Sequence, residues 1–480
     1  MASSLTSVVV VAQSHEGISE LSHVTATLSA YLDCSSTLPL ARACAVGSVS
    51  LLQRIWEISK TSESAIDSWC RPTNTWCPSR LLWTNQFYYQ DQFAKGMIAA
   101  CKGGYASTVE WLLNHFSACV VPPAAVEAAA QRGHREILRL LLDVHMKHKA
   151  LTRPGARTQG DKPHQVKFWE SNVLLAAAMG GHGDLVIWLY TDVFNGFYMH
   201  SNEEAVNELA RHGDYDSVRR LVASGWPLPR LDFAAEGGNV VIVQWLLNQH
   251  RDTGKQWALR NAARNGHLAV VKLLANDDFV TLDGQAFCGA AENGHLRVVQ
   301  WLKEQNLGWN TASKAIDLAA SNGHLDIVQY LHNECHASCT ALTMRNAVSN
   351  GHLDIVQWLY GKFKDDLNVD LLAVGTKEQM NTAIMDVAAG HGHLHVLKYL
   401  HKIAMSMDAF ETRSVNEKTV PICTPAAMQL AAAGGYLNVM QWLHAHYWTK
   451  PSVDVMDAAA ANGHLHIVKY LHQHNLAPLQ

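Results

Sequence analysis

Apolar residues in the middle of the chain follow two short helical patterns separated by a turn. Ile316, Ala319 and Ala320 recur at intervals of three and four positions, which is the buried stripe of a helix. The paired alanines allow a neighbouring helix to approach closely. Asn322 and Gly323 follow, and this pair predicts the end of the helix, because glycine adopts the left-handed conformation of a C-terminal cap without a Cβ clash.

A second helix is expected from Leu325 to His332, because Leu325, Val328 and Leu331 form one apolar face. The polar residues Asp326, Gln329 and His332 form another face. Each of the two helices has about eight to ten residues, and isolated helices shorter than about 12 to 15 residues are marginal in water. We therefore expect each helix pair to depend on its neighbours for stability.

The same pattern returns along most of the chain. Ala320–His332 is repeated with small changes as Ala291–Leu302, Val348–Leu359 and Ala460–His472. The glycine of the turn marks each copy, and it occurs at Gly133, Gly181, Gly213, Gly238, Gly266, Gly294, Gly323, Gly351, Gly392, Gly435 and Gly463, with weaker copies at Gly47 and Gly103. A fixed period indicates a stack of similar units, each burying an apolar face against the next.

The basic unit has 28 residues, because the marker glycines from Gly238 to Gly351 are spaced by 28 or 29 positions. The spacing is 48 residues after Gly133, 41 after Gly351 and 43 after Gly392. These longer intervals predict loop insertions near residues 145–170, 360–380 and 402–424.

The repeat resembles the ankyrin family in the sequence Ala-Ala-x-Asn-Gly-His-Leu-x-Val-Val-x-Trp-Leu, which runs from Ala290 to Leu302. The ankyrin opening Thr-Pro-Leu-His survives only as Thr424-Pro425-Ala426-Ala427, and the period is shorter than the usual ankyrin length of about 33. In both respects the chain is similar to short-repeat ankyrin arrays of some protists and large DNA viruses. The resemblance implies an all-α, helix-turn-helix solenoid with short or absent β-hairpin fingers.

We expect this array to occupy residues 96–480, preceded by a helical cap with degenerate repeats in residues 1–95. Ala43–Leu52 has the form of a worn repeat. The segment after it is the most aromatic of the chain, with Trp69, Trp76, Trp83, Phe87, Tyr88, Tyr89 and Phe93. An end repeat must cover the open face of a stack, so these rings are interpreted as a cap core, with an aromatic binding surface as the alternative.

Composition narrows the class of protein. The chain of 480 residues has 38 basic and 42 acidic residues, a net charge of −4, which argues against nucleic acid or an acidic membrane as a partner. No apolar run approaches the roughly 18 residues of a membrane span. The ten cysteines have no regular spacing, which is typical of a reducing compartment. We expect a monomer in the cytoplasm or nucleus.

Histidine is the unusual residue, with 27 copies. Eight of them follow the marker glycine, at His134, His182, His267, His295, His324, His352, His393 and His464. One side chain per unit at the spacing of packed helices cannot share one ion, so a structural role in the turn is predicted. The denser groups His391–His395, His444–His446 and His464–His474 leave a metal-binding or hydrolytic protein as the alternative, although no complete ligand set and no cofactor is predicted.

The repeats leave no room for a separate catalytic domain. Stretches without repeats are all shorter than the roughly 100 to 150 residues of an independent domain. Glycine-rich segments such as Gly390–Gly392 lack the third glycine and the preceding strand of a nucleotide-binding loop. The chain is therefore not expected to be an enzyme.

In ankyrin-like stacks the first helices line a concave groove, and two positions on their exposed face vary here from unit to unit. One directly follows the paired alanines and the other lies four residues earlier. The residues at these positions are Arg260, Arg264, Cys288, Glu292, Asp317, Ser321, Arg345, Ser349, Asp386, Gln429 and Asp457. Variation within a fixed frame indicates a groove that reads a protein partner, so the sequence favours a non-catalytic scaffold or adaptor.

The insertion at residues 145–167 supports a further alternative. Six of its residues are basic and only Asp161 is acidic, while Pro154 and Pro163 interrupt any helix. Such a segment is typical of a solvated loop, with docking of nucleic acid or of an acidic peptide as the alternative.

Overall fold

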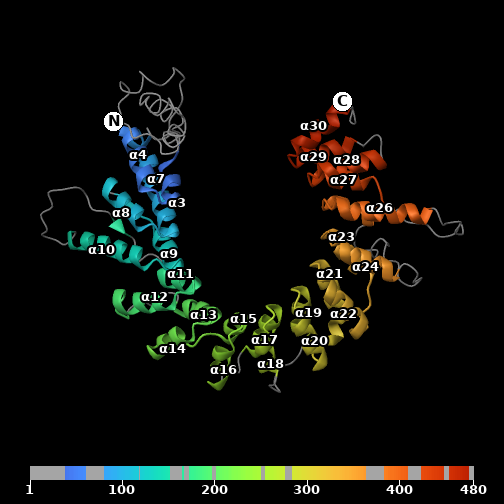
Figure 1. Cartoon of the computed structure of the whole chain (residues 1–480), viewed down its shortest axis with the longest axis horizontal. Helices are drawn as coiled ribbons and strands as arrows, with labels where there is room; N and C mark the ends of the chain where they lie inside the picture. The colour runs from blue at the N-terminus through green and yellow to red at the C-terminus, as the bar shows by residue number, and fades with distance from the viewer. Residues whose placement is uncertain are drawn as a thin grey trace, which may run out of the picture. The chain divides into compact units, whose positions relative to one another are not determined.

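The computed structural model describes residues 38–60, 81–117, 119–151, 165–166, 172–196, 202–249, 254–275, 284–363, 383–408, 423–447 and 453–474. These residues form helix pairs connected by tight turns, in two compact units that meet in sequence between Pro229 and Arg230. Each unit is a row of stacked pairs (Figure 1). The prediction of an all-α helix-turn-helix solenoid is therefore confirmed.

The first unit contains one short sheet besides its helices. Its helices are α3 (Leu40–Val46), α4 (Val49–Lys60), α6 (Leu81–Thr84), α7 (Gln86–Gly103), α8 (Ala106–His115), α9 (Pro123–Gln131), α10 (Arg135–Leu151), α11 (Val173–Met179), α12 (Gly183–Trp188), the π-helix η3 (Leu189–Val193), α13 (Asn202–His212) and α14 (Tyr215–Ala223). The strands β1 (Val120–Val121) and β2 (Gln165–Val166) pair in parallel. This pair is the only sheet among the residues described above, and no β-hairpin finger occurs among them.

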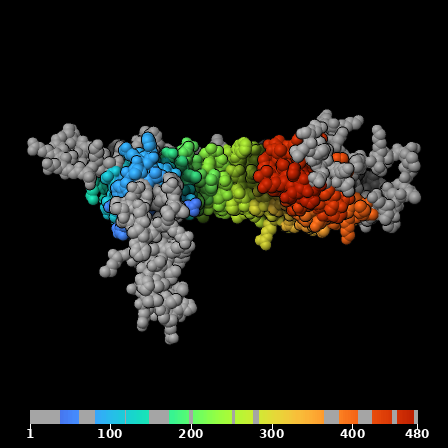
Figure 2. Space-filling view, turned by 90° about the horizontal axis from the view of Figure 1, so that it is seen from above, coloured from blue at the N-terminus to red at the C-terminus, as the bar shows by residue number. Residues whose placement is uncertain are grey.

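The second unit is more regular. Its helices are α15 (Leu231–Glu236), α16 (Val240–Asn248), α17 (Lys255–Arg264), α18 (Leu268–Ala275), α19 (Gln285–Glu292), α20 (Leu296–Glu304), the 3₁₀-helix η4 (Trp309–Thr311), α21 (Ala312–Ser321), α22 (Leu325–Cys335), α23 (Ala341–Ser349), α24 (Leu353–Phe363), α25 (Ile384–Gly390), α26 (Leu394–Asp408), α27 (Ala426–Ala433), α28 (Leu437–His446), α29 (Val453–Ala461) and α30 (Leu465–Gln473). The repeats around α17, in yellow-green, form a continuous packed band (Figure 2).

The core follows the predicted apolar pattern with one correction: Leu325, predicted on the apolar face of the second helix, is only half-buried, and Ile327 is fully buried. Ala319, Ala320, Val328 and Leu331 are fully buried, and the equivalent residues of the neighbouring repeats are buried as well. In the second unit the first helices of successive repeats (α15, α17, α19, α21, and onward) pack tightly against one another, whereas the second helices touch their neighbours less. Closer spacing on the first-helix side makes that side of the row concave.

The marker glycines end the first helices as predicted. Gly323 has φ = +85°, and the glycines of the other clear copies also lie in the left-handed region. Gly47 has φ = +72°, so Ala43–Leu52 forms a degenerate repeat from α3 and α4. One assignment was wrong by one residue: the left-handed glycine between α7 and α8 is Gly104, with φ = +79°, and Gly103 is the last residue of α7.

The turn histidines connect one repeat to the next. Nε2 of His324 donates to the backbone carbonyl of Glu292 at 3.1 Å, and Nε2 of His352 donates to the carbonyl of Ser321 at 3.0 Å. The same bond is formed by His267, His393 and His464 at 2.9 to 3.0 Å. Each ring also lies against the marker glycine of the preceding repeat. The predicted structural role of these side chains is confirmed for these five, which we call the histidine ladder.

Each of the three predicted insertions follows a second helix, and two of these helices, α10 and α26, are longer than the second helices of the other repeats. Helix α10 continues to Leu151, α24 to Phe363 and α26 to Asp408. Most residues of the insertions lie outside the described parts of the chain, apart from these helix ends and β2. Helix α7 runs without interruption across residues 95 and 96, where the boundary between cap and array was expected.

Candidate functional site

The candidate surface of the second unit is built on the exposed face of its first helices. At the position after the paired alanines, Arg264 is exposed, and Glu292, Ser321 and Ser349 are half-buried. The backbone carbonyls of Glu292, Ser321 and Ser349 accept the histidine-ladder bonds of the next repeats, so the backbone of this row is fixed by the fold. The side chains remain free to differ, and this row presents them along the concave side.

The second predicted row, four residues earlier, serves partly to join repeats. The Thr343 hydroxyl donates to the Asp317 carboxylate at 2.6 Å, and the Cys288 thiol donates to the Thr311 hydroxyl at 3.4 Å. Burial raises the pKa of the Asp317 carboxyl, and the bond from Thr343 opposes that shift. These residues join α21 to α23 and α19 to the start of α21.

Asp386 is the strongest case of this kind. Its side chain is fully buried and accepts bonds from the Thr424 amide at 2.8 Å and from the Thr424 hydroxyl at 2.5 Å. Burial raises the pKa of the Asp386 carboxyl, against the bonds from Thr424 and from the Ala383 amide. Cys288 is only 3% exposed. Asp386 and Cys288, both predicted as groove residues, therefore cannot contact a partner in this conformation, because their side chains are used inside the stack.

The other members of this row are accessible. Gln429 and Asp457 are exposed, and Arg260 and Arg345 are half-buried. The Arg260 guanidinium lies 4.8 Å from the centre of the Trp257 ring, which is a cation–π distance.

Sequence reasoning missed the apolar members of the same surface. Trp257 is 62% exposed and Leu342 is 50% exposed, and they lie three residues before Arg260 and Arg345 respectively. A spacing of three places both on the face of those arginines. Neither residue was considered in the sequence analysis, although the same spacing of three could have placed both beside the arginines.

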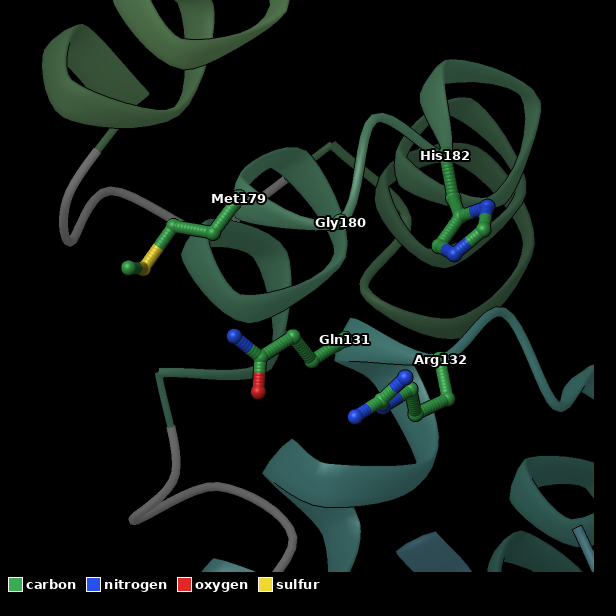
Figure 3. Close-up of a pocket in the computed structure, with 5 residues that line it drawn as sticks. All are labelled: Gln131, Arg132, Met179, Gly180 and His182. Carbon is green, nitrogen blue, oxygen red and sulfur yellow. The ribbon is translucent and has the colours of Figure 1, made fainter. Parts of the chain in front are cut away.

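In the first unit, the equivalent first-helix positions line an open pocket. Gln131 and Met179 directly follow the paired alanines of α9 and α11, and with Arg132, Gly180 and His182 they surround a space of about 430 Å³. Figure 3 shows the Gln131 amide and the Arg132 guanidinium side by side, with Met179 and His182 on separate sides of Gly180. None of these five residues was singled out as a groove residue from the sequence.

The aromatic cluster of the amino-terminal part forms a packed core. Trp56 is buried and contacts Trp83, Trp111 and Phe116 with ring centres 4.9 to 5.6 Å apart. Two rings are exposed: Trp83 is 49% exposed at the edge of this cluster, and Phe87 is 84% exposed. Trp69 and Trp76 lie outside the described residues. The rings that the structure places therefore support a cap core more than an aromatic binding surface.

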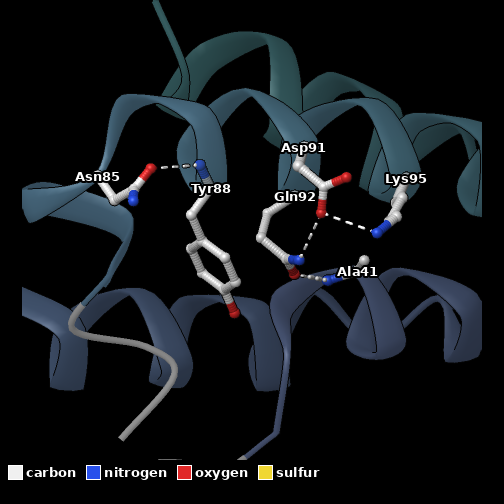
Figure 4. Close-up of polar contacts among 6 residues, drawn as sticks. All are labelled: Ala41, Asn85, Tyr88, Asp91, Gln92 and Lys95. Atoms are coloured by element: carbon white, nitrogen blue, oxygen red, sulfur yellow. Dashed lines mark hydrogen bonds and ion pairs between the residues drawn. The ribbon is translucent and has the colours of Figure 1, made fainter.

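Polar contacts hold α3 against α7 in the same region (Figure 4). Gln92 is 5% exposed, and its Oε1 accepts a hydrogen bond from the Ala41 amide at 3.1 Å. Its Nε2 donates to Asp91, which also pairs with Lys95 at 2.9 Å. The Asn85 side chain caps the start of α7 through the Tyr88 amide. These contacts fix α7 against α3 and cap the start of α7.

The carboxy-terminal histidines are hydrogen-bonded separately. His391 donates to Val387, His393 to Ser349 and His395 to Gly351, in each case to a backbone carbonyl at 2.8 to 2.9 Å. Within the described parts of the chain, no three His, Cys, Asp or Glu side chains are grouped to hold a metal ion. These three histidines are therefore directed to different backbone groups rather than to one point.

The aromatic position of the second helices is used for packing. The Trp358 ring lies 5.6 Å from the His332 ring, and the Trp442 ring lies 5.1 Å from the His401 ring. Each pair joins successive second helices. The regular Trp or Tyr of the second helices therefore serves packing at these contacts, where the rings touch a neighbouring repeat.

Two further findings concern nucleic-acid binding and membrane spans. Residues 152–164 of the basic insertion lie outside the described residues, so the structure does not place the nucleic-acid alternative. No helix among the described segments is long and apolar enough to cross a bilayer.

Comparison with known families identifies the repeat itself. A family model for ankyrin repeats (3 copies) matches residues 231–313, 261–344 and 287–371, all in the second unit. A search among curated proteins gave no significant match.

Proposed function

Because the chain is an ankyrin repeat protein, we propose that it is a non-catalytic scaffold or adaptor that binds a partner protein along the first-helix side of its second unit. Ankyrin repeats are protein-interaction modules. The observation that carries the proposal is a row of accessible side chains that differ from repeat to repeat, mounted on a backbone that the histidine ladder keeps constant.

The binding surface consists of the accessible predicted residues together with the exposed apolar ones. Its members are Trp257, Arg260, Arg264, Glu292, Ser321, Leu342, Arg345, Ser349, Gln429 and Asp457. Tryptophan and arginine dominate interface energetics because they combine large contact area with directed polar groups. The exposed Trp257, with Arg260 stacked on it, is therefore the expected centre of the interface.

Two further points complete the proposal. The seven cysteines that the structure places, for example Cys44 and Cys335, are free thiols, which supports action in a reducing compartment, the cytoplasm or the nucleus. We also propose that the chain acts as a monomer. The alternatives, a metal-dependent or hydrolytic protein and a nucleic-acid binder, have no observation among the described residues that favours them over protein binding.

The test is a matched pair of charge reversals. Arg260→Glu, Arg264→Glu and Arg345→Glu together should weaken the affinity for a partner isolated with the wild-type chain by at least tenfold, since each arginine faces the groove. The control reverses Lys272, Arg297 and Lys398, which are exposed on second helices. An unchanged affinity of the groove variant, or an equal loss in both variants, contradicts the proposal.

A further inference from the structure

The pocket of the first unit lies where two consecutive repeats lack the asparagine that caps the regular first helices. In regular repeats the residue before the marker glycine is asparagine, whose Nδ2 donates to the carbonyl four residues earlier, as from Asn322 to Leu318 at 3.0 Å and from Asn350 to Asn346 at 3.0 Å. In the first unit this position is Arg132 after α9 and Gly180 after α11. The arginine forms no such bond, and the glycine has no side chain.

Gly180 also brings two repeats unusually close. A Cβ atom at this residue would overlap the backbone carbonyl oxygen of Gln131 and press on the His182 ring. The backbone of the turn after α11 therefore lies directly on the end of α9. Any side chain at residue 180 would collide with the Gln131 carbonyl, so this close contact requires glycine.

Three polar side chains around the pocket have no partner within the described structure. Gln131 and Arg132 are exposed and form no hydrogen bond or ion pair there, and the half-buried His182 makes no ladder bond, unlike His324 or His352. Their groups that can donate hydrogen bonds, an amide, a guanidinium and an imidazole, surround one space. Polar groups of this kind gathered in a concave site are what fixes the orientation of a ligand.

The charge of the lining residues and the Met179 side chain indicate the chemical class of the ligand. No acidic residue lines the pocket, and the nearby Glu127 carboxylate already accepts a bond from the Asn172 amide at 2.9 Å. The Met179 side chain is 50% exposed and forms an apolar wall. A guanidinium and an amide suit a carboxylate, and a thioether wall suits methylene groups.

We propose that this pocket binds a glutamate side chain from an acidic segment of a partner protein. The carboxylate pairs with Arg132 and accepts hydrogen bonds from Gln131 and His182, and the aliphatic stem lies against Met179. The pocket shares no residue with the second-unit surface. This proposal rests on the proposed function only in taking the ligand to be part of a protein.

The test replaces Arg132 by the asparagine of the regular repeats. Arg132→Asn removes the charge and supplies the usual helix cap, so the fold is retained. The probe is a fluorescently labelled peptide of alternating glutamate and leucine, beside the same peptide with glutamine in place of glutamate. Wild-type protein should bind the glutamate peptide at least tenfold more tightly than the glutamine peptide, and Arg132→Asn should remove that preference. Arg297→Asn, which removes an exposed arginine from α20, is the matched control and should retain it.

Two further variants sharpen the result. Met179→Ala should weaken the glutamate peptide severalfold, since it removes the apolar wall, and Arg132→Lys should retain part of the affinity. Equal losses in Arg132→Asn and Arg297→Asn, no preference for glutamate in the wild type, or binding only of a phosphoserine peptide would each overturn the proposal. The assay uses no cellular partner, so its failure leaves the second-unit surface untouched, and failure of the groove variant leaves this pocket untouched.

Discussion

The two units use the same repeat under different constraints. In the second unit, asparagine side chains cap the carboxyl ends of the first helices α17, α19, α21, α23 and α29. In most of these repeats a turn histidine also donates a hydrogen bond to the preceding repeat. In the first unit the asparagine position holds Gly103, Arg132, Gly180 and His212 instead. There, β1 and β2 and the π-helix η3 also interrupt the regular pattern.

This difference shows which positions the stack requires. The paired alanines, the left-handed glycine and the buried leucine of the second helix are present in both units, because without them neighbouring helices cannot pack. The cap and the ladder bond are locally replaceable, since each contributes only about 1 kcal/mol. In the first unit Arg132 replaces the capping asparagine and His182 makes no ladder bond within the described residues, so both side chains are available to a ligand.

The largest expected effect tests the shared glycine. Gly323→Val should destabilise the protein by about 2 to 4 kcal/mol, because a β-branched residue is strained at φ = +85° and its Cβ would lie 2.7 Å from the His352 ring. Urea unfolding measures the loss. Gly361→Val is the control, since a Cβ at Gly361 meets nothing within 4 Å. Equal stability of the two variants would show that the turn does not constrain the fold.

The second largest expected effect comes from comparing Asp386, which is buried, with Asp457, which is exposed at the same repeat position. Asp386→Ala should cost about 2 to 3 kcal/mol, because it leaves the Thr424 amide and hydroxyl without an acceptor inside the stack. Asp457→Ala, at the same repeat position but exposed, should change stability by less than about 0.5 kcal/mol. Comparable losses from both changes would contradict the assignment of Asp386 as an inter-repeat bond.

The histidine ladder allows a direct comparison between the units. His352→Ala should cost about 1 kcal/mol through the lost bond to the Ser321 carbonyl. His182→Ala should cost less, because His182 forms no such bond within the described residues. Urea unfolding of both variants checks the order, and the reverse order would count against the ladder as a source of stability.

His393 of the ladder and His295, at the same turn position in another repeat, also predict a pH dependence. Burial lowers the pKa of His295 and of His393 below the ordinary value of 6.5, although bonds to backbone carbonyls oppose the shift. The unfolded chain then binds more protons than the native state, so the contribution is complete above pH 6.5 and declines as pH falls toward the lowered folded pKa. In His295→Asn with His393→Asn the slope of stability against pH between 5.5 and 7 should be shallower than in the wild type. An identical slope would exclude these two histidines as its source.

The smallest effect concerns the asparagine cap. Asn322→Ala should cost about 0.5 kcal/mol, because the bond to the Leu318 carbonyl is exposed to water. Arg132→Asn should have the opposite sign and a similar size. A loss of stability in Arg132→Asn would show that the arginine itself supports the first unit.

The sequence was sufficient for the fold because the repeat signal is local and redundant. The spacing of Gly238, Gly266 and Gly294, for example, determines both the turn and the register of the helices beside it. The accessible surface was harder to predict, because one repeat position can face solvent or the next repeat. Asp457 is exposed and Asp386 is buried at the same position, and the difference depends on Thr424, which lies 38 residues further along the chain. The pocket was also missed, because it results from absent side chains.

The central claim is that a constant frame presents a variable surface on the first-helix side of the second unit, and that a partner protein binds there. Hydrogen–deuterium exchange of the chain with and without its isolated partner tests this claim most directly. The account predicts slower exchange in α17, α19, α21 and α23 on binding, and little change in α18, α20, α22 and α24. Protection confined to the second helices, or to neither set, would contradict it.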